Sequence, residues 1–89
     1  MSKVNIYVII VTYNAMQWID RCLGSLRQSS IPLTPIAIDN GSKDETVAYI
    51  RAHFPETILF VQEKNLGFGQ GNNVGIRYAL AHEATHVLL

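Results

Sequence analysis

Residues 8–14 read Val-Ile-Ile-Val-Thr-Tyr-Asn, and residues 36–42 read Ile-Ala-Ile-Asp-Asn-Gly-Ser. In each stretch, polar residues directly follow a short apolar run. If both runs are parallel strands of one sheet, their polar ends lie side by side on its carboxyl edge, where open α/β folds bind ligands. The two stretches therefore predict a fold and a binding site within it.

The chain around the first stretch predicts a strand and then a helix. Consecutive apolar residues at 6–11 indicate a strand buried on both faces, as in a parallel sheet between helix layers. Asn14 is expected to cap the following helix, which ends at residues 29–32. The apolar positions of that helix have the spacing of one helical face: Met16, Ile19, Leu23 and Leu26.

The second stretch predicts the same pair of elements. Residues 35–39 are expected to form a strand, and Ser42 with Glu45 three residues on has the spacing of a capping box that begins a helix. The apolar residues that this helix would bury are Val47, Ile50 and Phe54.

The last third of the chain predicts a strand at residues 57–62, a glycine-rich loop at 65–73, a helix at 74–82 and a strand at 85–89. The order βαβαβαβ implies an α/β fold with a mostly parallel sheet and right-handed crossovers. Because the sequence stops within an apolar strand, we expect the sheet to be incomplete at its carboxyl-terminal end. Its open edge would then allow self-association, or another part of a longer protein would cover it.

The composition is that of one globular domain. Of 89 residues 48% are hydrophobic and 16% charged, and seven basic side chains balance seven acidic ones. Without a basic stripe, the sequence gives no indication of a nucleic acid partner. A single cysteine, Cys22, fits a reducing compartment and is expected to be a buried small side chain rather than a reactive thiol. The first apolar run is too short to span a bilayer, so a cytoplasmic location is expected.

Asp39 is the first candidate for chemistry. An ionised carboxylate only accepts hydrogen bonds, so at a strand end it suits a ring N–H or a ribose hydroxyl. The alternative is a simple turn made with Asn40 and Gly41. Thr12, Tyr13 and Asn14 would add hydroxyls and an aromatic face beside it, with packing and capping as their alternative roles.

The glycine-rich loop is the second candidate. Gly67, Gly69 and Gly71 would let the backbone approach a ligand, and Asn73 would place an amide in the first turn of the next helix. The glycine spacing does not match a dinucleotide fingerprint or a P-loop. Phe68 would be a pocket wall or a hydrophobic plug. Two lysines beside the polar loops, Lys43 and Lys64, are expected to be solvated. Three histidines do not have the spacing of metal ligands: His53, His82 and His86.

Three stretches together carry a resemblance to a known family: residues 11–14, residues 38–44, and residues 65–73 with Gly75. In this order and spacing they resemble the amino-terminal half of the nucleotide-sugar-binding domain of family 2 glycosyltransferases, in particular the rhamnosyltransferase-like branch. The resemblance covers essentially the whole chain, residues 1–89. It implies the Rossmann-like GT-A fold and inverting transfer of a sugar from a UDP- or dTDP-sugar to a saccharide or lipid-linked acceptor.

The resemblance also implies roles for individual residues. Thr12 and Tyr13 would line the base and ribose pocket, and Asp39 would hydrogen-bond the pyrimidine ring. The other nucleotide-binding residues would be Asn14, Asn40, Gly67, Phe68 and Asn73.

Two parts of the family pattern do not occur before Leu89. One is the Asp-x-Asp motif that binds the divalent cation, Mn or Mg, and the other is the acidic residue that acts as general base. A diphosphate leaving group needs charge stabilisation and the acceptor hydroxyl needs its proton removed. We therefore expect these 89 residues to bind nucleotide at most, without metal, and to need further residues for transfer.

Other classes of protein stay open at this point. The main alternative is a nucleotide-binding or interaction module without catalysis. A nucleotidyltransferase would want a glycine-rich, Arg-containing loop after the first strand, where Thr12-Tyr13-Asn14 stands, and the failed fingerprint disfavours a dinucleotide oxidoreductase. By resemblance, the full-length enzyme would assemble surface polysaccharide in the cytoplasm or at the membrane periphery.

Overall fold

A computed structural model describes residues 4–89 of the chain. Four strands form one sheet in the order β3-β2-β1-β4, and all neighbouring pairs are parallel. The strands are β1 (Ile6–Thr12), β2 (Thr34–Asp39), β3 (Ile58–Val61) and β4 (His86–Leu88). The helices are α1 (Ile19–Arg27), α2 (Thr46–His53) and α3 (Gly67–Ala81). The predicted α/β class and parallel sheet are confirmed.

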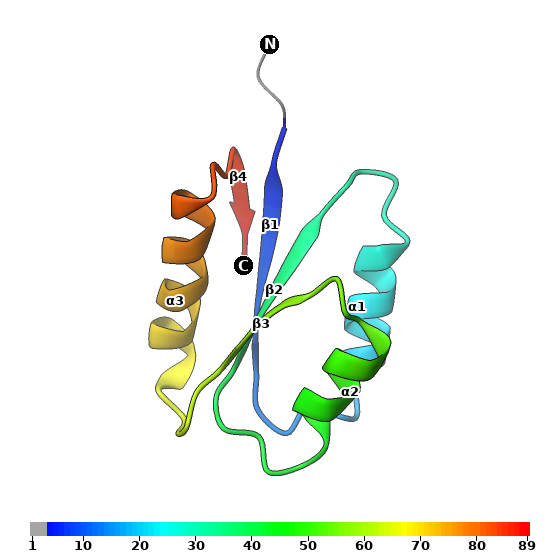
Figure 1. The fold of residues 1–89 in the computed structure, drawn as a ribbon, viewed down its shortest axis with the longest axis vertical. Helices are drawn as coiled ribbons and strands as arrows, with labels where there is room; N and C mark the ends of the chain where they lie inside the picture. The colour runs from blue at the N-terminus through cyan, green and yellow to red at the C-terminus, as the bar shows by residue number, and fades with distance from the viewer. Residues whose placement is uncertain (1–3) are drawn as a thin grey trace.

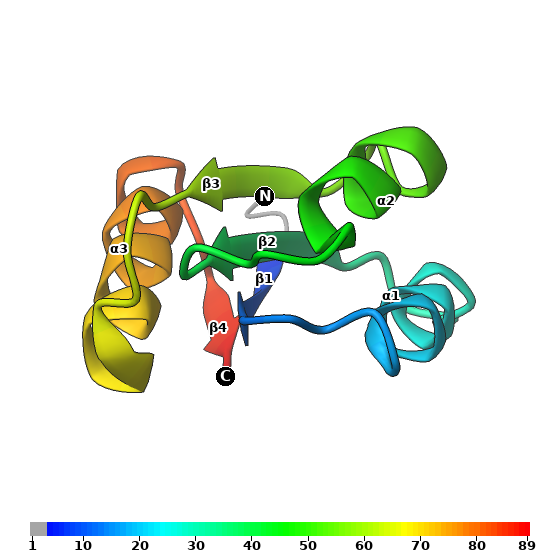
Figure 2. The same cartoon turned by 90° about the horizontal axis from the view of Figure 1, so that it is seen from below.

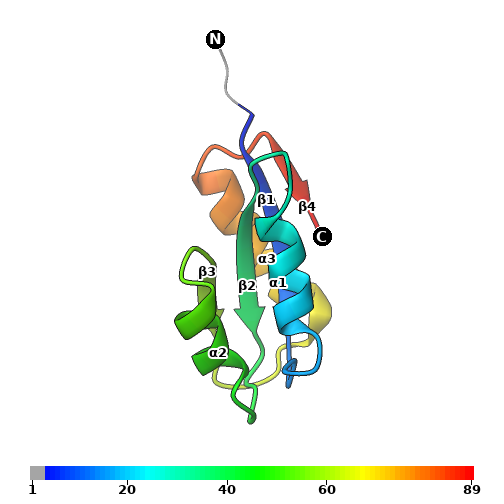
Figure 3. The ribbon, with the colours of Figure 1, turned by 90° about the vertical axis from the view of Figure 1, so that its right-hand side faces the viewer.

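The helices cover the two faces of the sheet unequally. Helices α1 and α2 lie on one face and α3 lies alone on the other, so the molecule has three layers (Figures 1 and 2). Strand β4 stands at the edge beyond β1, and no helix among residues 4–89 lies over it on the α1 side (Figure 3).

Each helix layer has its own apolar core against the sheet. On the α1–α2 side, Ile19 and Leu23 of α1 pack with Ala37 of β2 and Ile50 of α2. On the other side the core cluster consists of Tyr7, Ile9, Ile36, Ile38 and Ala79. The strands therefore carry apolar side chains to both faces, as their near-continuous apolar runs predict.

The glycine-rich segment is helical, so the loop expected at residues 65–73 and a helix start at 74 are wrong. Helix α3 begins at Gly67 and runs through the glycines. The reason is tertiary packing: a Cβ on Gly75 would come within 2.7 Å of Ile9 Cγ2, and one on Gly71 within 3.0 Å of Val11 Cγ2. These two glycines let the helix backbone lie close to β1, which offsets their poor helix propensity.

Candidate functional site

Strands β1 and β2 bring the two predicted polar ends together. Thr12 is the register partner of Asp39, and its Oγ1 donates a 2.7 Å hydrogen bond to Asp39 Oδ1. Ser42 donates to the same carboxylate twice, from Oγ to Oδ1 and from its backbone N–H to Oδ2 at 2.8 Å. Thr12 and Asp39 are fully buried. The carboxylate is thus the centre of an internal network at the carboxyl edge of the sheet.

The turn after β1 is joined to the turn after β2 through Asn14. Asn14 has a φ of +49°, its N–H donates to Ser42 Oγ at 2.8 Å, and its Oδ1 accepts from the N–H of Lys43 at 2.7 Å and of Asp44 at 3.3 Å. The prediction that Asn14 caps α1 is wrong, because its side chain is bound to the other loop. Trp18 occupies the N-cap position without a side-chain cap.

Asp44 and Thr46 hold the starts of both helices on this side. Asp44 Oδ1 accepts from the N–H and the hydroxyl of Thr46, and its Oδ2 accepts from the N–H of Met16 at 3.3 Å. The Thr46 hydroxyl oxygen accepts from the N–H of Ala15 at 2.8 Å. The hydrogen bond from the Thr46 hydroxyl lowers the pKa of the exposed Asp44 carboxyl.

The predicted capping box is therefore wrong. Glu45 stands at the N-cap of α2 and makes no side-chain cap bond, and Ser42 is bound to Asp39 and Asn14. The sequence did not predict that Asp44 and Thr46 bind the backbone before α1 and at the start of α2. The available signal was an Asp two residues before the first residue of a helix, since Asp is a preferred capping residue type.

The start of α3 meets the end of β2 at Asn40. Asn40 is 2% exposed, and its Nδ2 donates to the carbonyl oxygen of Gly67 at 3.2 Å. Its Oδ1 has no partner among residues 4–89, and neither does Oδ1 of the buried Asn72. Gly67 has a φ of +85°, a backbone conformation that other residue types rarely adopt. Buried amide oxygens without partners are unusual in folded proteins.

The other predicted residues lie around this centre. Tyr13 follows the buried Thr12 and is 45% exposed, and Phe68 in the first turn of α3 is 69% exposed. Asn73 lies in the second turn of α3, not the first as expected, because the helix begins earlier. Figure 2 looks onto this edge, with the loops after β1 and β2 and the yellow start of α3 facing the viewer. Asp39, Thr12, Asn14 and Asn40 are joined by hydrogen bonds or pairing, whereas Phe68 and Asn73 lie outside that network.

The described residues do not fit a metal ion. Residues 4–89 contain no group of three His, Cys, Asp or Glu side chains that could hold one.

Cys22 is partly buried, and burial raises the pKa of its thiol, which disfavours the reactive thiolate. Among the helices of this same part of the chain, none combines the length and the apolar character needed to span a membrane.

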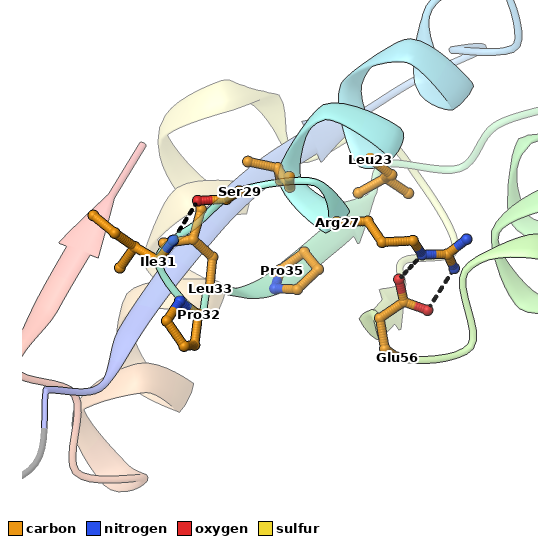
Figure 4. A pocket seen from close by; sticks show the side chains of 9 residues that line it. Leu23, Arg27, Ser29, Ile31, Pro32, Leu33, Pro35 and Glu56 are labelled. Carbon is orange, nitrogen blue, oxygen red and sulfur yellow. Dashed lines mark hydrogen bonds and ion pairs between the residues drawn. The ribbon is translucent and has the colours of Figure 1, made fainter.

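A cavity lies at the amino-terminal end of β2, opposite the carboxyl edge of the sheet. It has a volume of about 210 Å³, and the Arg27–Glu56 ion pair, with a 2.8 Å contact, stands beside it (Figure 4). Its other lining residues are mostly apolar: Leu23, Leu26, Ser29, Ile31, Pro32, Leu33 and Pro35. None of the residues expected to bind nucleotide lines it, so it is separate from the carboxyl edge.

The fold agrees with the comparisons to known proteins. The model of Glycosyl transferase family 2 matches residues 7–82, and the chain belongs to this family. Over 73 residues it is 34% identical to the chondroitin synthase of Escherichia coli, a match that covers 79% of this chain and 11% of that protein. The chain thus spans about a tenth of this relative's length.

A solved structure shares the fold. It is the mannosyltransferase PcManGT from Pyrobaculum calidifontis in complex with GDP-Man and Mn2+, with a TM-score of 0.78 and 23% identity. The match covers 89% of this chain and 25% of that one. The expected family and the Rossmann-like GT-A fold class are confirmed, and the rhamnosyltransferase-like branch stays a prediction.

Proposed function

We propose that the carboxyl edge of β1 and β2 binds the nucleoside diphosphate of a sugar donor, and that the chain serves in a glycosyltransferase. The observation that carries the proposal is the pairing of Thr12 with Asp39 at the sheet edge of a chain that belongs to Glycosyl transferase family 2. In open α/β folds such an edge is the usual ligand site.

The proposed site has an exposed aromatic ring beside a buried polar network. The exposed ring of Tyr13 offers a stacking face for a base. Asp39 keeps its proposed role as the acceptor for a pyrimidine ring, and the hydrogen bonds that its carboxylate accepts from Thr12 and Ser42 fix its orientation. The residues assigned to the site are Thr12, Tyr13, Asn14, Asp39, Asn40, Gly67, Phe68 and Asn73.

The finer assignments rest on the relatives. Similarity to a chondroitin synthase supports a role in polysaccharide synthesis. Inverting transfer to a saccharide or lipid-linked acceptor is proposed from membership of the family. The Mn2+ in the mannosyltransferase complex supports a divalent cation in the reaction, although residues 4–89 do not offer it three ligands. A single, partly buried cysteine agrees with a cytoplasmic location.

Calorimetric titration of the chain with UDP, dTDP, GDP and NAD tests the proposal. We expect a nucleoside diphosphate to bind and NAD not to bind. Replacing Tyr13→Ala should weaken binding at least fivefold, because base–aromatic stacking contributes about 1–3 kcal/mol. Trp18→Ala is the matched control, since Trp18 is 42% exposed against 45% for Tyr13 and lies beyond the site at the start of α1.

Two results would contradict the proposal. One is a chain that binds NAD in preference to the diphosphates. The other is equal weakening by the Tyr13 and Trp18 variants, which would place the ligand elsewhere.

A further inference from the structure

The loop after β1 is held in an uncommon backbone conformation at Asn14. Its φ of +49° lies in the left-handed region, which Asn tolerates better than most residues other than Gly. Two residues before Asn14, Thr12 is fixed in β1 by pairing with Asp39. Tyr13 is therefore held between a strand end and a constrained turn, and the direction of its exposed ring depends on both.

Asn14 is also the point where the two loops of the edge are joined. Its N–H donates to Ser42 Oγ, while its Oδ1 accepts from the backbone N–H groups of Lys43 and Asp44. Ser42 in turn donates to Asp39. We call this set of bonds among Asn14, Ser42, Lys43 and Asp44 the loop clasp. It links segments that are 28 to 30 residues apart in sequence.

We propose that Asn14 is a positioning residue for nucleotide binding: through the loop clasp it fixes Tyr13 and the turn after β2, and it does not itself touch the ligand. The side-chain oxygen of Asn14 is engaged by two backbone donors, so it is not free to bind a nucleotide. The inference rests on the proposed function and assigns to Asn14 a role different from direct contact.

Two substitutions distinguish the effect of the Asn14 side-chain oxygen from the effect of its backbone conformation. Asn14→Gly keeps the left-handed conformation and removes the acceptor, whereas Asn14→Asp keeps both an oxygen acceptor and tolerance of this conformation. We expect Asn14→Gly to speed hydrogen exchange of the Lys43 amide and to weaken binding of UDP, dTDP or GDP roughly tenfold, the effect of losing one or two hydrogen bonds. Asn14→Asp keeps an acceptor for the backbone donors, so the Lys43 amide should exchange as slowly as in the wild type.

A double-mutant cycle with Tyr13→Ala tests whether Asn14 acts through Tyr13. We expect Asn14→Gly to have little further effect on binding once the Tyr13 ring is gone, because the two changes then remove the same interaction. A purely structural role would instead give additive losses, and this result would overturn the positioning role. Unchanged binding by Asn14→Gly, or fast exchange of the Lys43 amide in Asn14→Asp, would overturn it as well.

The experiment distinguishes this inference from the proposed function. If the wild-type chain binds none of the diphosphates, the proposed function fails, whatever the variants do. If the wild type binds and Asn14→Gly binds equally well, the proposed function stands and only the role of Asn14 is wrong.

Discussion

At the scale of single residues, the edge of the sheet depends on the buried pair of Thr12 and Asp39. Thr12→Val keeps the shape of the side chain but takes one donor away from a carboxylate with no exposed surface. We expect a loss of about 1–3 kcal/mol in the free energy of unfolding, because a buried charged group is left with fewer hydrogen bonds. Urea denaturation at neutral pH measures it.

Thr57 provides a matched control for this substitution. It is also a buried threonine, but its hydroxyl has no hydrogen-bond partner among residues 4–89. Thr57→Val should therefore be neutral or stabilising, since it removes a polar group that gains nothing from burial. Equal losses in the Thr12 and Thr57 variants would mean that the bond to Asp39 adds no stability.

At the scale of elements, apolar runs predict the strands well and local composition predicts the loops badly. Residues 6–11 and 35–39 are expected as strands, and the structure extends each by one residue. The start of α3 could not be predicted, because glycine favours loops in isolation and only the close approach to β1 makes Gly71 and Gly75 suitable in a helix. The roles of Asn14 and Asp44 were missed for a similar reason: their partners lie on another loop.

Gly75→Ala tests the packing of α3 on β1. Alanine has a helix propensity better by about 1 kcal/mol, but its Cβ would lie 2.7 Å from Ile9 Cγ2 in the core, and such overpacking costs about 1–3 kcal/mol. We expect a net loss of stability. Gly69→Ala is the control in the same helix, because no atom lies within 4 Å of its added Cβ. It should raise the melting temperature, and a rise in both variants would contradict the packing argument.

At the scale of the whole molecule, the sequence predicts which chain segments meet but not which hydrogen bonds and ion pairs join them. Parallel topology alone places the ends of β1 and β2 side by side, and the pairing of Thr12 with Asp39 confirms this. The hydrogen bonds between the loops, and the Arg27–Glu56 pair that joins the end of α1 to the segment before β3, depend on distances that only the folded chain defines.

The hydrogen bonds of Asp44 and Glu56 make the stability of the molecule depend on pH. Hydrogen bonds lower the pKa of Asp44, chiefly through the Thr46 hydroxyl, and of Glu56, chiefly through the Arg27 side chain. A lowered pKa in the folded state stabilises the protein above the ordinary carboxyl pKa of about 4, and this contribution is lost as the pH falls through the folded-state value.

Asp44→Asn and Glu56→Gln should therefore be less stable than the wild type at pH 7, and the difference should shrink as the pH falls below the ordinary carboxyl pKa. Both groups are exposed, so solvent screens the effect and we expect it to be modest. Urea midpoints measured from pH 7 to pH 3 test this, with Glu63→Gln as an exposed control in the segment after β3. A difference that stays constant with pH would show that the variants act through packing rather than through the carboxylate charge.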